Sequence, residues 1–300
     1  MYRVRLPKPL APSEQQTLTI SYAVLSALEP LPTAIAQTDK QYLTYSFNAY
    51  LPSLYNTLKQ KTKLKFPNDD VQSYTPLSSA DGTDAERLGS GLTYGPFNEL
   101  PAGSSSPVTV RYEFTKPVPH ATLLERDIEI SHWGGNLATE ERYWLTNHAA
   151  ELKSQFSRVE WQRSAYYKPP SSAMEWIQMP LKIGSTDPYF TDDIGNVSTS
   201  RFRSNLAEAN LELKPRYPVF GKWNYKFRVG WDRDLRSSLR KMKTGDSYVL
   251  SVPFLEGLKP AEGISYERVQ LRVILPEGAK YVIIRILRDS PLIYKQECQV

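Results

Sequence analysis

The chain has 300 residues, of which 40% are hydrophobic and 23% are charged, and its formal net charge is +5. This balance excludes a disordered chain, and the length suits about two globular domains. It contains 19 Tyr and 23 Pro but only 4 Met. Aromatic residues favour strands and prolines favour turns, so the composition indicates a β-rich fold.

Cysteine use and hydropathy limit the class of protein further. The single cysteine, Cys298, excludes an internal disulfide and a cysteine-rich zinc site, and taken alone it indicates a reducing compartment. Residues 1–10 alternate polar and apolar residues, unlike a signal peptide. No run approaches the roughly 18 apolar residues of a membrane span. The sequence alone therefore predicts a soluble chain without a targeting signal.

Alternation of apolar and polar residues, the period of a half-buried strand, recurs along the chain. It is clearest in residues 108–114, 225–231 and 269–275. Further strands are predicted at Tyr2–Leu6, Thr17–Leu25, Tyr42–Leu51, Lys63–Phe66, Met174–Leu181 and Tyr248–Phe254. Helix signals are sparse, and only residues 52–60 suit two helical turns, with Ser53 as the N-cap. We predict a mainly β protein with two tandem antiparallel β-sandwich-like domains and few helices.

The prolines of Thr115–Leu124 follow one completed strand and precede a second series of strands. We place the domain boundary there. The prediction is a first domain over residues 1–115, a linker over 116–127, a second domain over 128–280 and a divergent tail over 281–300.

Two stretches are strongly basic. Arg236–Lys243 is short and precedes Thr-Gly-Asp, so we interpret it as a solvated loop. Lys59–Phe66 alternates Lys with other residues, which is typical of the solvent face of a strand and equally of a binding stripe. The net charge permits contact with nucleic acid or an anionic lipid surface but requires neither.

Candidate catalytic and metal-binding residues are few. The histidines are His120, His132 and His148, and none has the i, i+4 spacing of a helical zinc pair. Neither a nucleophile elbow nor a phosphate loop is present. Asp187, Asp192 and Asp193 could supply oxygen ligands to calcium, but the EF-hand spacing is absent and acidic hairpin loops are common. We expect no catalytic residue, no metal and no cofactor.

The segment "DIEISHWGGNLATEERYWL", Asp127–Leu145, concentrates His, Trp, Gly and acidic residues. Ile128 and Ile130 alternate with charged residues, which predicts a strand, and Gly134–Gly135 suits a hairpin turn. On the return strand Glu141 shares a face with apolar residues, whereas Glu140 projects from the opposite face. That geometry does not suit a carboxylate pair, so we predict a hairpin and not an active site.

The same residues carry a resemblance. "EISHWGGNLATEE" followed by "HAAELKSQFSRVEWQR" resembles the luminal region of the ribophorin I family, subunits of the eukaryotic oligosaccharyltransferase. Further similar stretches follow the same order and together cover roughly Tyr2 to Lys280. They include "VQSYTPL", "YGPFNELPA", "DDIGNVSTS", "LELKPRYPVFGKW" and "VQLRVILPEGAK".

The resemblance implies a single-pass membrane subunit of the endoplasmic reticulum, with two luminal β-rich domains, a membrane helix and a cytosolic tail. The complex transfers a preassembled glycan from dolichol diphosphate to Asn in N-x-Ser/Thr sequences, and its catalytic and metal-binding residues lie in another subunit. The implied partners are the other oligosaccharyltransferase subunits and nascent polypeptides, with no nucleic acid. The low cysteine count then reflects a luminal fold that does not rely on disulfides.

Two further expectations rest on the resemblance. Asn196, in the only N-x-Ser/Thr triplet of the chain, becomes a glycan acceptor. The family pattern ends after Lys280, so we expect a luminal fragment that lacks the signal peptide, the early strands and the membrane helix.

Two alternatives belong to other functional classes. A glycan-binding β-sandwich module would expose coplanar Trp and Tyr rings beside polar side chains, although most aromatic residues here occupy core-facing positions. A metallohydrolase would require His120, His132 or His148 to converge with acidic residues.

Overall fold

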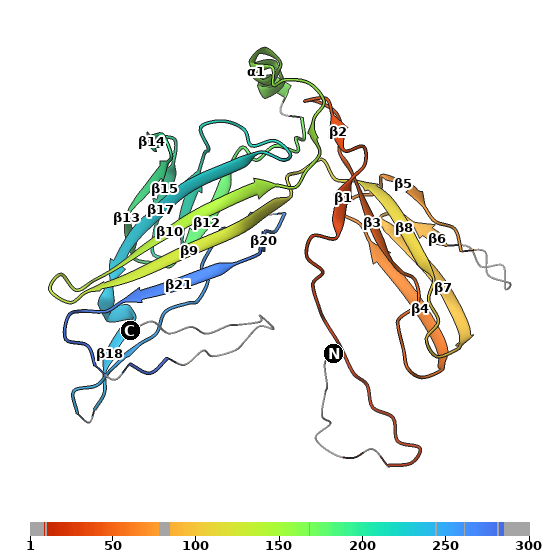
Figure 1. The fold of residues 1–300 in the computed structure, drawn as a ribbon, viewed down its shortest axis with the longest axis horizontal. Coiled ribbons are helices and arrows are strands. Elements are labelled where there is room, and N and C mark those ends of the chain that lie inside the picture. The colour runs from red at the N-terminus through yellow and green to blue at the C-terminus, as the bar shows by residue number, and fades with distance from the viewer. Residues whose placement is uncertain are drawn as a thin grey trace. The chain divides into compact units, whose positions relative to one another are not determined.

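The computed structural model describes residues 9, 11–77, 85–167, 169–243, 245–260, 262–280 and 282–284 (Figure 1). The predicted strand Tyr2–Leu6 and the lone Cys298 lie outside these residues. The chain forms two compact units. Unit 1 comprises residues 1–33 and 42–114, and unit 2 comprises residues 34–41 and 115–300. Strands dominate both units, so the predicted mainly β class is confirmed.

Unit 1 contains two antiparallel sheets. One has the order β1 (Leu28–Pro30), β3 (Tyr42–Asn48), β8 (Pro107–Glu113) and β5 (Val71–Tyr74). The other has the order β4 (Thr57–Lys65), β7 (Gly91–Leu100) and β6 (Glu86–Leu88). Phe47 of β3 meets Tyr94 of β7 edge to face, with ring centroids 6.3 Å apart. The two inner faces therefore pack together as a sandwich.

The large sheet of unit 2 contains seven strands in the order β14, β13, β17, β10, β9 and β20, with β21 also beside β9 (Figure 1). Their bounds are β9 Pro119–Ser131, β10 Asn136–Asn147, β13 Ser185–Asp192, β14 Gly195–Asn196, β17 Asn224–Asp234, β20 Ser265–Tyr266 and β21 Val269–Ile274. β20 and β21 run parallel to β9. The other pairs of this sheet are antiparallel as predicted. The two parallel pairs are an exception, because the connection over residues 235–264 is long enough for a parallel crossover.

A smaller antiparallel sheet of β12 (Ile177–Leu181), β16 (Ala209–Leu213) and β15 (Arg201–Ser204) packs against the large one. One buried cluster contains Tyr143, Phe190 and Val229 of the large sheet together with Met179 and Leu211 of the small one. These residues alternate with polar residues along their strands, so the side chains of the sandwich core are those that the alternation in the sequence places on one face.

Six short elements complete the described part of unit 2. β2 (Ala34–Ile35) pairs with β11 (Glu151–Leu152) in parallel, and α1 spans Arg158–Tyr167. A 3-10 turn, η1 (Leu235–Ser237), leads into the hairpin of β18 (Leu239–Lys241) and β19 (Tyr248–Leu250). In the described part of the chain, no helix has the length and apolar character of a membrane span.

Two predicted elements are wrong. Residues 57–60 of the predicted helix belong to β4, where Gln60, Thr62 and Leu64 pair with the strand β7. Thr17–Leu25 forms no strand: its apolar side chains, including Ile20 and Tyr22, are exposed, and its backbone has no neighbouring strand to pair with in the described chain. Alternation of apolar and polar residues alone does not make a strand, because the backbone N–H and C=O groups also need hydrogen-bond partners on a neighbouring strand.

The other predicted strands correspond to elements of the structure. The predictions over residues 108–114, 225–231 and 269–275 overlap β8, β17 and β21, and four of the remaining predictions overlap β3, β4, β12 and β19. Unit 1 ends at Phe114, and residues 119–127 of the expected linker form the first part of β9. Those residues are ordered as strand because β10 and β21 pair with them on both sides.

Candidate functional site

The hairpin predicted around Gly134–Gly135 is confirmed. β9 and β10 pair from Ser131 opposite Asn136 onward, and Gly135 has a positive φ of 66°. Glu141 is fully buried, whereas the side chain of Glu140 is 23% exposed on the opposite face. The two neighbouring carboxylates therefore belong to two different networks.

The inner network is a buried ionic cluster. Glu141 lies directly opposite Arg126 across the hairpin and accepts a short hydrogen bond from its guanidinium group. Tyr143 donates to the second Glu141 oxygen at 2.6 Å, and Arg126 also donates to Glu256 at 2.6 Å. Burial raises the pKa of the Glu141 carboxyl against the opposing pull of Arg126. Burial, followed by the proximity of Glu141, raises the pKa of Tyr143.

This cluster joins the inner face of the large sheet to the segment after β19. Glu256 lies in that segment, and its second oxygen is 3.8 Å from the guanidinium of Arg233 on β17. Arg233 in turn donates to Ser238 at 2.8 Å. Because each charge has an opposite charge beside it and little contact with solvent, the cluster is suited to fixing the fold and not to turning over a substrate.

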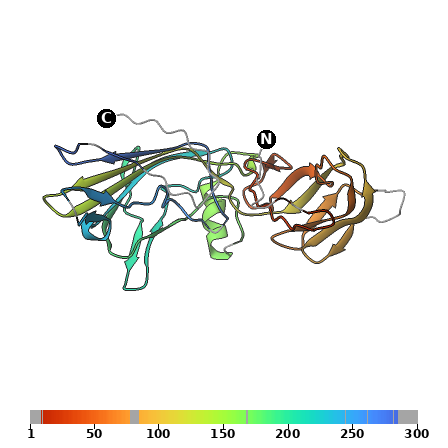
Figure 2. The same ribbon diagram turned by 90° about the horizontal axis from the view of Figure 1, so that it is seen from below.

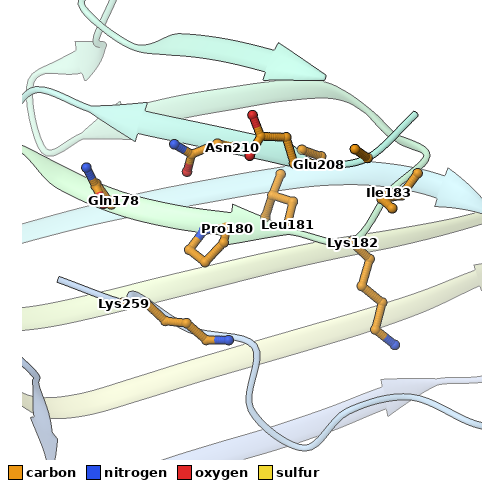
Figure 3. Close-up of a pocket in the computed structure, with 10 residues that line it drawn as sticks. Gln178, Pro180, Leu181, Lys182, Ile183, Glu208, Asn210 and Lys259 are labelled. Carbon is orange, nitrogen blue, oxygen red and sulfur yellow. The ribbon is translucent and has the colours of Figure 1, made fainter. Parts of the chain in front are cut away.

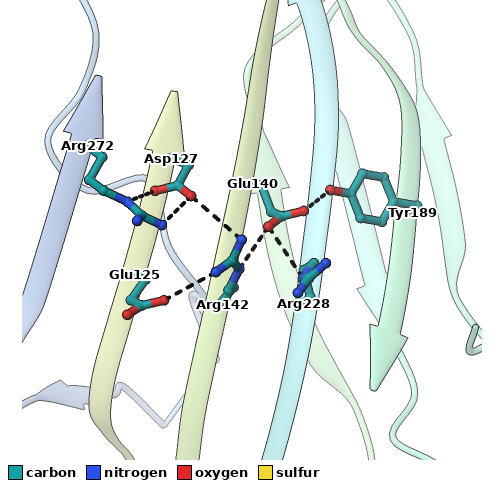
Figure 4. Close-up of polar contacts among 7 residues, drawn as sticks. All are labelled: Glu125, Asp127, Glu140, Arg142, Tyr189, Arg228 and Arg272. Atoms are coloured by element: carbon teal, nitrogen blue, oxygen red, sulfur yellow. Dashed lines mark hydrogen bonds and ion pairs between the residues drawn. The ribbon is translucent and has the colours of Figure 1, made fainter. Parts of the chain in front are cut away.

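The outer network covers the polar face of the same sheet (Figure 4). Arg272 of β21 binds Asp127 of β9 through two hydrogen bonds of 2.6 Å. Arg142 of β10 donates to Glu140 at 2.9 Å and lies 3.6 Å from Glu125 of β9. The charged members are Arg142, Arg228 and Arg272 against Glu125, Asp127 and Glu140. Three positive charges thus meet three negative ones, which leaves no free acid or base.

Tyr189 of β13 extends this network across the sheet. Its hydroxyl donates to Glu140 at 2.5 Å, and burial together with this bond raises the pKa of Tyr189. Its ring lies over Gly230 of β17, where an added Cβ would come within 2.4 Å of the ring. A larger residue at position 230 would therefore displace Tyr189 and break the contact between β13 and β10.

Asn196 lies on the exposed edge strand β14, opposite Thr191 of β13, which in turn pairs with Arg228. Side chains of directly opposed residues share a face, so Asn196 lies on the same face as the outer network. Val197, the next residue, is buried at 4% exposure and anchors the edge. The sequon is therefore presented by an ordered strand at the border of a polar surface.

The acidic loop beside Asn196 is structural. Asp192 accepts hydrogen bonds from the backbone N–H groups of Ile194 and Gly195, and from Arg216 at 2.6 Å. The hydrogen bond from Arg216 holds the pKa of Asp192 below its ordinary value, although burial opposes it. Asp193 is exposed, and within the described chain no three His, Cys, Asp or Glu residues are close enough to hold a metal ion.

The histidines do not converge on one site. His120 and His148 stack with ring centroids 4.4 Å apart, and His120 bonds Ser265 at 2.7 Å. Burial and the neighbouring His120 lower the pKa of His148. His132 instead contacts Trp133 at the turn of the β9–β10 hairpin, with ring centroids 5.3 Å apart. His120 also lies 3.6 Å from the carboxylate of Glu267, but the described residues contain no group of three possible ligands that a metallohydrolase would need.

A shallow cavity of about 580 Å³ lies over the small sheet of unit 2 (Figure 3). It is lined by Gln178, Pro180, Leu181, Lys182, Ile183, Ala207, Glu208, Ala209, Asn210 and Lys259. Glu208 is the one carboxylate of this lining, and no aromatic ring belongs to it. The cavity therefore lacks both an acid pair for glycoside chemistry and a stacking platform for a sugar.

Comparison with known sequences identifies the relationship. The sequence profile of ribophorin I matches residues 1–291. The chain belongs to the ribophorin I family. This confirms the resemblance seen along the sequence and extends it to residue 291, beyond the expected end of the family pattern at Lys280.

Three relatives of this chain bear the name dolichyl-diphosphooligosaccharide–protein glycosyltransferase subunit 1 or 1B. The Schizosaccharomyces pombe protein is 34% identical over 293 residues, which cover 95% of this chain and 63% of that protein. The Caenorhabditis elegans protein is 34% identical over 94% of this chain and 46% of its own length. Subunit 1B of Arabidopsis thaliana is 35% identical over 93% of this chain and 58% of its own length. The chain thus spans between 46% and 63% of these relatives.

Proposed function

We propose that this chain is a non-catalytic subunit of the oligosaccharyltransferase, the complex that transfers a preassembled glycan from dolichol diphosphate to Asn in N-x-Ser/Thr sequences. The match to the ribophorin I family over residues 1–291 carries the proposal. The charge pairing supports it: the carboxylates of both networks in unit 2 are bound to arginines, so none of them is available as a general base.

The role of the chain is binding and assembly. Both networks connect neighbouring strands or segments by charge-assisted hydrogen bonds, which stiffen the sheet and present its faces in one arrangement. A stiff surface loses little entropy when a partner binds, which suits a subunit that supports the assembly and presents nascent polypeptides. The expected partners are the other subunits of the complex, on the luminal side of the endoplasmic reticulum membrane.

The test of this role is affinity isolation of the tagged chain from detergent-solubilised endoplasmic reticulum membranes. Co-isolation of the other transferase subunits in constant ratio supports the proposal. A tagged chain that is present in the membranes but recovers none of them contradicts it.

We further propose that Asn196 is a glycan acceptor. Its exposed position on β14 leaves the side-chain amide open to solvent, and a glycan there would extend along the polar outer face. Endoglycosidase treatment of the isolated chain should increase its gel mobility, and Asn196→Gln should abolish that shift. An unshifted wild-type chain that is isolated with the complex would refute the modification while leaving membership intact.

A further inference from the structure

The turn of the β9–β10 hairpin projects a tryptophan into solvent. Trp133 is 93% exposed, and its recorded ring contact is with His132 beside it. Gly134 and Gly135 follow, so no bulky side chain covers the indole on that side. An indole with this exposure does not stabilise the fold by burial, because its apolar surface stays in contact with water.

A second projection is the hairpin formed by β18 and β19, here called the basic ribbon and defined as residues 239–250. It carries Arg240, Lys241 and Lys243, and of these Lys241 pairs with Asp246 at 3.0 Å. No carboxylate lies at ion-pair distance from Arg240 or Lys243 in the described chain. The arginines of the outer network, by contrast, are all paired.

The basic ribbon also exposes apolar side chains. Tyr248 is 57% exposed, Val249 is 54% exposed and Met242 is 48% exposed. Arg240 pairs across the ribbon with Val249, and Lys241 pairs with Tyr248. Cations and apolar groups are therefore neighbours, and a two-stranded ribbon of this kind is only marginally stable in water without a covering surface.

The two projections leave from the same end of unit 2 (Figures 1 and 2). Leu235, just before the ribbon, donates its backbone N–H to the carbonyl of Gly135 in the turn at 2.8 Å. Beneath them Ile130 and Leu137 of the hairpin form a buried cluster with Leu235, against which Leu239 and Leu250 of the ribbon pack. The exposed indole and the unpaired cations thus belong to two projections that leave from the same end of unit 2 and rest on one buried cluster.

We propose that this end of unit 2 docks on a membrane surface that bears anionic headgroups. The features are convex, and a bilayer interface accepts convex projections without a complementary groove. Indole rings favour the headgroup region, where one side is apolar and the other is wet. Arg and Lys stems can lie along that region while their charges reach lipid phosphates.

The test is flotation of the full chain with vesicles of phosphatidylcholine alone or with 30% phosphatidylserine. Binding should require phosphatidylserine and weaken with salt. The double variant Arg240→Gln/Lys243→Gln should lower partitioning roughly 30-fold, about fivefold per cation, and Trp133→Ala by about tenfold or more. The control is Lys61→Gln/Lys63→Gln on the exposed face of β4, which removes the same charge and should change binding less than about threefold.

Unchanged melting temperatures should accompany these losses, because all the substituted side chains are exposed. Equal losses in the ribbon and β4 variants would overturn the proposal in favour of non-specific attraction. Failure to bind either vesicle would overturn it outright. Binding to polyglutamate but not to vesicles would replace the membrane with an acidic protein as the partner.

Discussion

At the scale of residues, unit 2 separates two adjacent glutamates into different environments. Glu141 is enclosed with Arg126 and Tyr143, whereas Glu140 joins the solvent-facing network. A buried carboxylate is tolerated only with a partner that compensates its lost hydration, so Arg126 and Glu141 depend on each other.

Replacement of Glu141 by Ala should therefore be severe. The variant leaves Arg126 with one carboxylate fewer, and we expect the free energy of unfolding to fall by about 3–5 kcal/mol. Urea unfolding followed by tryptophan fluorescence measures this directly, since all 6 Trp lie in unit 2. Glu140→Ala is the matched control and should cost less than about 1 kcal/mol. Equal effects of the two substitutions would contradict the separation of the networks.

Asp192 gives a pH-dependent prediction. Its pKa is held below the ordinary value chiefly by Arg216, so the ionised form stabilises the fold above the unfolded pKa. That stability is lost as the pH falls through the folded pKa. Asp192→Asn should thus cost about 1 kcal/mol at pH 7 and clearly less near pH 3, below the ordinary pKa of aspartate. Urea midpoints at the two pH values test this, with the exposed Asp193→Asn as control. A cost that does not change with pH would show that the charge of Asp192 is irrelevant.

At the scale of elements, α1 was not predicted, although the sequence contains a signal for the start of this helix. Ser157 precedes the helix, and its hydroxyl accepts from the N–H of Glu160 at 3.3 Å. Ser157-x-x-Glu160 is a capping-box sequence, whereas Ser53 of the helix predicted over residues 52–60 is followed three residues later by Asn56 and not by Glu or Gln. Trp161 then anchors the helix on Phe220, with ring centroids 5.4 Å apart.

Loss of the cap should weaken α1 locally. Ser157→Ala should lower the free energy of unfolding by about 1 kcal/mol, because a helical N–H loses its acceptor. Ser157→Asp preserves an acceptor oxygen and should retain most of the stability. Thermal melts of the three proteins distinguish these outcomes, and an Asp variant as weak as the Ala variant would show that the hydroxyl does not act as a cap.

Predictability differs between elements for physical reasons. The β9–β10 hairpin could be predicted from the sequence, because the alternation of apolar and polar residues and the Gly-Gly turn fix its register. That register alone places Arg126 opposite Glu141. The role of Glu256 could not be predicted, because this residue joins the cluster from a segment 130 residues away from Arg126 in the sequence. The parallel pairing of β21 with β9 was also hidden, since alternation defines a strand but not its neighbour.

At the scale of the whole molecule, the chain does not divide into two successive domains. Residues 34–41 belong to unit 2 although they lie within the sequence of unit 1. Gln41, which is fully buried, accepts from the N–H of Ala150 at 2.7 Å and donates to the carbonyl of Lys116 at 3.1 Å. Unit 2 therefore requires a piece of chain from well before its main part.

Gln41→Ala should destabilise unit 2 by about 2–4 kcal/mol, because the buried N–H of Ala150 and the partly buried carbonyl of Lys116 both lose a partner. Tryptophan fluorescence again reports unit 2 alone. The same substitution at the exposed Gln178 is the control and should have little effect. If Gln41→Ala leaves the unfolding midpoint unchanged, residues 34–41 contribute nothing to unit 2.

The most direct test of the central claim measures glycan transfer in two samples. One is the eluate obtained with the tagged chain from solubilised endoplasmic reticulum membranes, and the other is the purified chain alone. Each receives a dolichol-diphosphate-linked glycan and an acceptor peptide containing N-x-Thr. A non-catalytic subunit predicts transfer by the eluate and none by the purified chain. Transfer by the purified chain, or an eluate without activity from membranes that are themselves active, would contradict it.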